Sequence, residues 1–148
     1  GSGEAVTINT LDRRPEDGPA GGIRDVIVEH LTGAMEGAIN LVAERKGDIS
    51  GVVLRQIDLT QRLGELGTGQ CYDLRPTYQD RFPSDDAAGR INAWRIGPDG
   101  RVIGVHDYPG GMPGVFAQNV LDLTLDDVTI TRPDPLPKAC NPLTHVLA

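Results

Sequence analysis

The stretch IRDVIVEHLTGAMEGAINLVAERKGD, residues 23–48, decides the fold class, because its two parts differ in residue preference. Residues 23–31 are rich in β-branched side chains, which favour a strand. Further on, Ala, Met, Leu, Glu, Arg and Lys dominate, with Thr32 in a capping position and Gly47 just past the last basic residues. This pattern predicts an amphipathic helix over residues 33–46.

A single helix over residues 23–46 is the alternative interpretation of the same stretch. An apolar stripe at helical spacing continues back through Ile23, Ile27 and Leu31. The β-branched run and Gly33, in the middle of the pattern, favour a strand followed by a helix.

Alternating apolar and polar residues predict further strands on both sides of this stretch, over residues 5–11, 49–59 and 119–132. Within 119–132 the alternation changes phase at Asp126 and Asp127, which indicates a bulge or tight turn. No internal repeat is apparent in the sequence.

Residues 91–107, INAWRIGPDGRVIGVHD, have the pattern of a β-hairpin, with a turn over residues 97–100. The sequence therefore predicts an α+β fold dominated by β-structure, with the helix packed on an antiparallel sheet or sandwich. An all-β barrel is the alternative.

Length and composition are those of one domain with many turns. A chain of 148 residues can bury a normal core, and it contains 19 Gly and 11 Pro. Four of the prolines crowd into residues 133–148, which predicts an extended C-terminal arm on a single domain covering residues 1–148.

The net charge of −7 comes from acidic residues that are scattered along the chain. Such a surface repels phosphate, so nucleic acid is not an expected partner. No stretch approaches the roughly 20 apolar residues of a membrane span, so membrane insertion is not expected either.

Cys71 and Cys140 are the only cysteines, and a disulfide between them is the simplest use of the pair. Closing a loop of about 70 residues would stabilise the fold by roughly 4 kcal/mol and would tether the C-terminal arm. A disulfide implies an oxidising, extracytoplasmic location. Two unpaired thiols are the alternative.

No arrangement of residues indicates catalysis. The histidines at positions 30, 106 and 145 lack the spacing of metal ligands, and no serine lies in a nucleophile motif. The glycine-rich segment 108–114 matches no phosphate-binding loop. We therefore expect no catalytic residue, no metal site and no cofactor.

Two functions are compatible with this pattern. The first is non-catalytic binding or assembly as a structural subunit, secreted, on a surface or in a virion, through self-association or another protein. The second is a β-scaffold that binds a small molecule, as a carrier or as an enzyme of the cyclase or isomerase type. Its apolar pocket would be lined by Tyr72, Tyr78, His106 and Tyr108.

Overall fold

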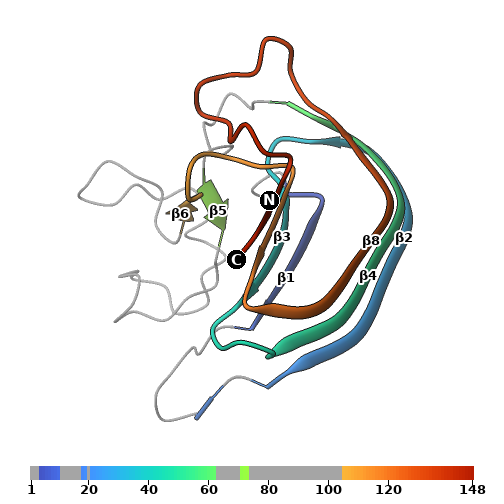
Figure 1. Cartoon of the computed structure of the whole chain (residues 1–148), viewed down its shortest axis with the longest axis vertical. Helices are drawn as coiled ribbons and strands as arrows, with labels where there is room; N and C mark the ends of the chain where they lie inside the picture. The colour runs from blue at the N-terminus through green and yellow to red at the C-terminus, as the bar shows by residue number, and fades with distance from the viewer. Residues whose placement is uncertain (1–3, 11–17, 20, 63–70, 74–104) are drawn as a thin grey trace, which may run out of the picture.

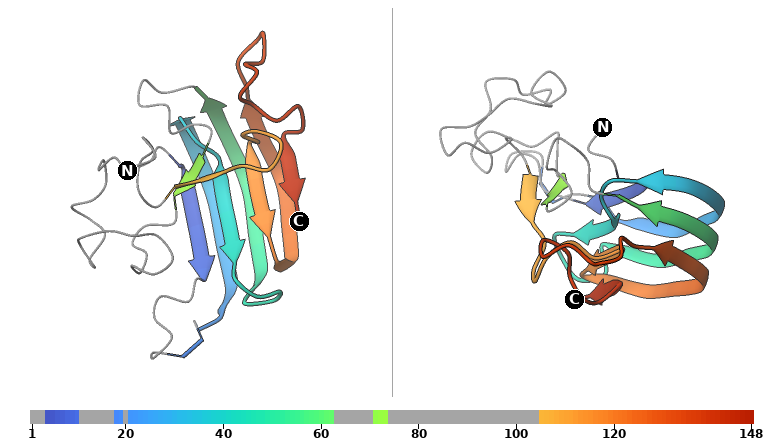
Figure 2. Two further views of the ribbon diagram at one scale, coloured as in Figure 1. Left: turned by 90° about the vertical axis from the view of Figure 1, so that its left-hand side faces the viewer. Right: turned by 90° about the horizontal axis from the view of Figure 1, so that it is seen from above.

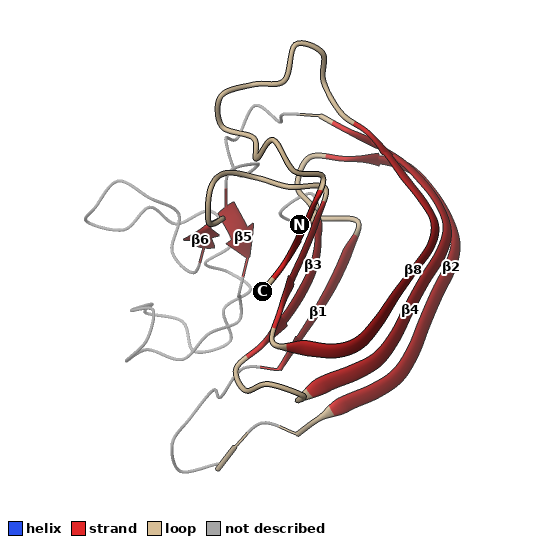
Figure 3. Cartoon of the chain, viewed as in Figure 1, coloured by secondary structure: helices blue, strands red, loops and turns tan. Residues whose placement is uncertain are grey.

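The structure is a computed structural model that describes residues 4–10, 18–19, 21–62, 71–73 and 105–148. In these ranges the chain forms strands and loops, with no helix (Figure 3). Four strands are short: β1 Val6–Thr10, β3 Ile39–Ala43, β7 Val115–Gln118 and β9 His145–Leu147. Three are long: β2 Ile23–Met35, β4 Ile49–Gln61 and β8 Val120–Thr131. The remaining two are β5 Cys71–Asp73 and β6 Val105–Asp107.

The short and long strands alternate along the chain and stack into two separate parallel sheets. One sheet has the order β1-β3-β7-β9 and the other the order β2-β4-β8. Each coil of the chain therefore adds one short and one long strand to the coil before it, as Figure 2 shows. This arrangement is a parallel β-solenoid. The pair β5-β6 is antiparallel and lies beside the stack (Figure 1).

The long strands bend twice, at matching positions, around the short ones (Figure 1). At each bend the backbone has a positive φ of 53° to 65°. The strand register aligns these residues into two rows, which are Asp25, Gly51 and Asp122 in the first and His30, Gln56 and Asp127 in the second. Gly, Asp, Asn and His tolerate a positive φ better than most residues. All but one of the six bend positions have such a residue, and Gln56 is the exception.

Each bend residue inserts one extra position into the inward-facing pattern. In β4 the inward side chains are Ile49, Val52, Leu54, Ile57 and Leu59, at spacings of three, two, three and two, and all are buried. Apolar side chains occupy the same positions in β8, at Val120, Leu123, Leu125, Val128 and Ile130. The chain therefore carries an internal repeat, in contrast to the expectation from sequence.

The core fills the space between the two sheets, and the two inner short strands, β3 and β7, are covered on both faces. All five residues of β3 are buried. Its inner face contributes Ile39 and Leu41 to the main core. Its outer face is covered by a second cluster that includes Tyr108 and Phe116, whose rings meet edge to face at 5.5 Å. Burial on both faces explains why four of the five residues of this strand are apolar, with Asn40 as the exception.

The helix predicted over residues 33–46 is wrong, and so is the alternative helix over 23–46. This segment is the end of β2, a tight turn and then β3. Met35 and Ile39 face the same core from two different strands, and this produces the helix-like spacing. Gly33 has a φ of 145°, outside the helical region.

The predicted antiparallel sheet or sandwich and the barrel alternative are also wrong, because the two large sheets are parallel and separate. The strands expected over residues 5–11, 23–31, 49–59 and 119–132 are confirmed as β1, β2, β4 and β8. The irregularity at Asp126 and Asp127 is confirmed as the second bend of β8. Most of the predicted hairpin, residues 91–104, lies outside the described residues.

The predicted disulfide between Cys71 and Cys140 is wrong. Cys140 is a free cysteine, 6% exposed, packed as a small apolar side chain against the second cluster. Its backbone forms a parallel bridge with Met112. This bridge, together with β9, attaches the proline-rich segment 133–148 to the chain's own solenoid. The disulfide was the reason for expecting an extracytoplasmic location. Without the disulfide, that location stays a prediction.

Candidate functional site

The β8 end of the solenoid is the candidate site, because its apolar interior is only partly covered. In the central strand β4 the inward side chains of Leu54 and Ile57 are 0% and 1% exposed. Their neighbours one strand along, Leu125 and Val128, have the same inward position but are only half-buried. Solenoids normally close such ends with a capping repeat that has a polar outer face.

The backbone edge of β8 is also unpaired among the described residues. Within the described residues β8 pairs with β4 alone and is the last strand of its sheet. Strand β2 at the other end is likewise an edge strand, but it is preceded by residues 11–17, which lie outside the description. Residues 63–70 and 74–104, between β4 and β7, lie outside the description as well. An edge strand with free N–H and C=O groups is a template for pairing with another strand.

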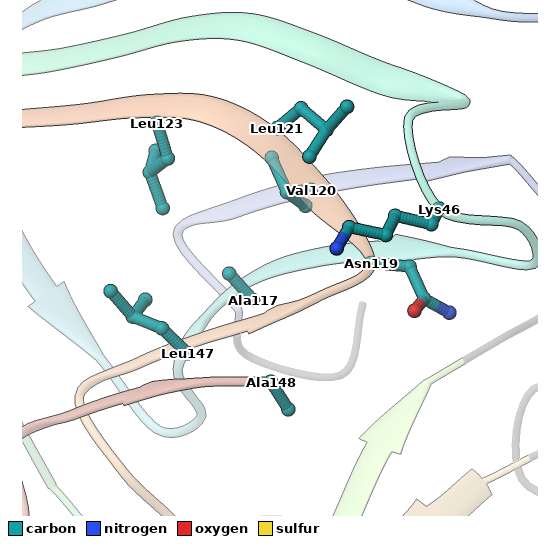
Figure 4. A pocket seen from close by; sticks show the side chains of 8 residues that line it. All are labelled: Lys46, Ala117, Asn119, Val120, Leu121, Leu123, Leu147 and Ala148. Atoms are coloured by element: carbon teal, nitrogen blue, oxygen red, sulfur yellow. The ribbon is translucent and has the colours of Figure 1, made fainter.

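A pocket of about 320 Å³ opens at this end, next to the start of β8. Its lining consists of Lys46, Ala117, Asn119, Val120, Leu121, Leu123, Leu147 and Ala148. Val120, Leu123 and Leu147 reach toward one space, and the Lys46 side chain lies along its rim (Figure 4). Ala117 and Val120 belong to the core or pack against it, so the pocket continues the solenoid interior.

The turn that begins β8 is held by Asn119. Its backbone adopts a φ of 60°, and its side-chain Nδ2 donates to the Ala43 carbonyl oxygen at 3.0 Å. Its backbone N–H donates to the carbonyl oxygen of Ala148 at 2.8 Å. One residue therefore connects three successive coils and sets where β8 starts.

The other end of β8 is fixed by Arg132. Its guanidinium donates to Oε1 of Gln61 at 2.9 Å and to the carbonyl oxygens of Asn141 and Met112 at 2.7 and 2.8 Å. Gln61 is buried, and its Nε2 donates to the carbonyl oxygens of Gly37 and Pro113. The open edge is therefore held firmly at both ends.

The outer face of the long sheet carries a row of alternating charge. The register aligns Glu29, Arg55 and Asp126 across β2, β4 and β8. Arg55 Nε donates to Glu29 Oε2 at 2.6 Å, and both side chains are about 40% exposed. Asp126 ends the row on the edge strand and is exposed.

The residues predicted to bind a small molecule lie elsewhere. Tyr72 is directly opposite His106 in the β5-β6 register. Tyr108 is buried on the outer face of the short-strand sheet, where its hydroxyl donates to Asn40 Oδ1 at 2.8 Å. Tyr78 lies outside the described residues. Tyr108 is not among the residues that line the pocket at the β8 end, and the ligand-binding role of the four residues stays a prediction.

The spacing of apolar residues in the sequence contains a signal for this site that alternation within single strands does not show. The 3-2-3-2 apolar spacing in 49–59 recurs in 120–130, and a comparison of the two segments in register indicates stacked parallel strands. Stacked parallel strands imply an apolar interior between the coils and an edge strand at the end of the stack.

Comparisons with protein-family models, with curated proteins and with solved structures found no significant match. Among the described residues, no helix is long and apolar enough to cross a membrane. The same part of the chain contains no group of three or more His, Cys, Asp or Glu side chains that could hold a metal ion.

Proposed function

We propose that the protein is a non-catalytic assembly module whose β8 edge binds a strand from another protein. The observation that carries this proposal is the difference between β4 and β8. The same inward apolar positions are buried in β4 and only half-buried in β8, beside a backbone edge that no described strand pairs. An added parallel strand would cover both the apolar side chains and the free backbone groups.

The energetics favour an occupied edge. Fully burying a Leu, Ile or Val side chain contributes about 1.5–3 kcal/mol relative to leaving it exposed. Five inward side chains of β8 are each covered only in part, and the pocket next to Val120 adds further uncovered apolar surface. A docked strand would complete this burial along the whole length of β8.

The charges favour a different protein over a second copy of this chain. Stacking a second copy head to tail would place its β2 on β8 in the register that β2 and β4 already show. Asp126 would then face Glu29 of the second copy, and Asp122 would face Asp25. Like charges directly opposite each other are destabilising, and the net charge of −7 adds to the repulsion.

Strand addition is tested with a peptide of the β4 sequence, residues 49–61, because β4 is the strand that β8 pairs with in the fold. Short β-prone peptides self-associate, so a small soluble carrier presents this one on a Gly/Ser linker. Hydrogen exchange read by mass spectrometry should show slowed exchange in β8 when the peptide is added.

The matched control is a scrambled peptide of identical composition on the same carrier. It should leave exchange in β8 unchanged, because its apolar residues no longer match the inward spacing. If the β4 peptide gives no protection in β8, or if both peptides protect equally, the proposed function is wrong.

A further inference from the structure

We infer that the docked strand presents a basic side chain opposite Asp126. This inference rests on the proposed function and adds the partner's chemistry to it. The partner is a polypeptide segment with apolar residues at the 3-2-3-2 spacing, and with Arg or Lys at the position that follows its third apolar residue.

The row of alternating charge on the outer face of the long sheet ends at Asp126. Across the long sheet the row runs Glu29, Arg55, Asp126, so that each carboxylate has a guanidinium as its neighbour in register. Arg55 makes its hydrogen bond and ion pair with Glu29, at 2.6 and 2.5 Å. Asp126 has no hydrogen bond or ion pair within the described part of the chain, and it is exposed on the last described strand of the sheet. A basic residue on the next strand would continue the alternation.

Asp126 differs from its acidic neighbours in β8 because it does not lie at a bend of the backbone. Asp122 and Asp127 both adopt a positive φ, which Asp tolerates, so the bends of β8 account for them. Asp126 is not among the residues of positive φ, and its side chain lies on the outer face. No backbone requirement explains a carboxylate at this position, whereas recognition of a basic residue does.

The bends and the core set the remaining requirements for the partner strand. It must bend where β8 bends, which favours Gly, Asn or Asp at the positions facing Asp122 and Asp127. Its apolar side chains must pack against the half-buried side chains of Leu123, Leu125 and Val128. Strand β4 has Gly51 at the first bend and Arg55 opposite Asp126, and it makes the second bend at Gln56, which is not one of the favoured residues.

The test is a charge exchange between the peptide and the protein. The two probes are the β4 peptide of residues 49–61 on its carrier and the same peptide with Arg55→Glu. Each is titrated, by fluorescence anisotropy, against the wild-type protein and an Asp126→Lys variant. We expect the Arg55→Glu peptide to bind the wild-type protein about tenfold more weakly, because an attraction becomes a repulsion. The Asp126→Lys variant should reverse this preference.

A Glu36→Lys variant is the control for overall charge. Glu36 is exposed in the turn after β2, so the variant changes the net charge equally without altering the β8 edge. It should keep the wild-type preference, and high salt should reduce the preference in every case.

The outcomes separate the two proposals. If both peptides bind the wild-type protein equally well and protect β8, strand addition stands and the inference about Asp126 is wrong. A preference that Glu36→Lys reverses as well would also overturn the inference, because overall charge would then explain it. If neither peptide binds, both the inference and the proposed function fail, and the acidic residues of β8 only prevent edge pairing.

Discussion

Arg132 joins three segments of the chain at the β8 end. Its guanidinium joins the buried amide of Gln61 to carbonyl oxygens of the segment before β7 and of the C-terminal arm. The sequence indicated nothing of this role, because Arg132 stands between a strand pattern and a proline-rich segment. Its partners are far from it in sequence, apart from Asn141, and come together only when the coils stack.

Replacing this side chain should destabilise the fold markedly. We expect Arg132→Met to lower the free energy of unfolding by about 2–3 kcal/mol, because it removes the donor from the Gln61 amide oxygen and the Asn141 carbonyl oxygen, and one of two donors from the Met112 carbonyl oxygen. Urea denaturation followed by circular dichroism measures the change. Arg62→Met is the control, since Arg62 is exposed, and it should cost less than about 0.5 kcal/mol. Equal losses in the two variants would refute the role assigned to Arg132.

At the scale of elements, strands were predictable from the sequence, and their pairing was not. Alternating patterns identified β1, β4 and β8, and the phase change at Asp126 and Asp127 identified a real bend. The 3-2-3-2 spacing has a mean period of 2.5, between the strand and helix periods, so it resembled neither template throughout. In residues 33–46, two strands joined by a tight turn produced the spacing of an amphipathic helix.

The candidate site was predictable only in part for the same reason. Alternation within one strand has the same form in parallel and antiparallel sheets, so no single segment shows which strand lies beside it. Ile49 and Val120 are partners in register but are separated by a long segment of sequence. Only this long-range pairing shows that β8 is an edge strand. Of the predicted site residues, Tyr72 and His106 do lie opposite each other, but the prediction gave no reason for this.

A matched pair of truncations tests whether the end of the solenoid is open. Leu54 in β4 and Leu125 in β8 are neighbours in register, and both face inward. We expect Leu54→Ala to cost about 2–5 kcal/mol, as is usual for a buried leucine, and Leu125→Ala to cost at most about half as much. Chemical denaturation of both variants gives the comparison. A loss for Leu125→Ala as large as that for Leu54→Ala would mean that the inner face of β8 is covered.

At the scale of the whole molecule, the solenoid is a stack whose stability comes from contacts between neighbouring coils. The sheet order places β8 and β9 together at one end, with the pocket between them. In such a stack each coil covers the one before it, so an end that no described residue caps is a surface on which a further strand can continue the same pattern. The central claim is that β8 accepts this strand in a parallel orientation.

Paramagnetic relaxation tests this claim most directly. A nitroxide at the first residue of the carrier-linked β4 peptide marks the start of the docked strand. In a parallel register it must lie near Val120 and far from Thr131, as Ile49 does in the fold. We predict that amide resonances at the start of β8 broaden while those near Thr131 stay sharp. Broadening near Thr131, or no broadening along β8, would contradict the account.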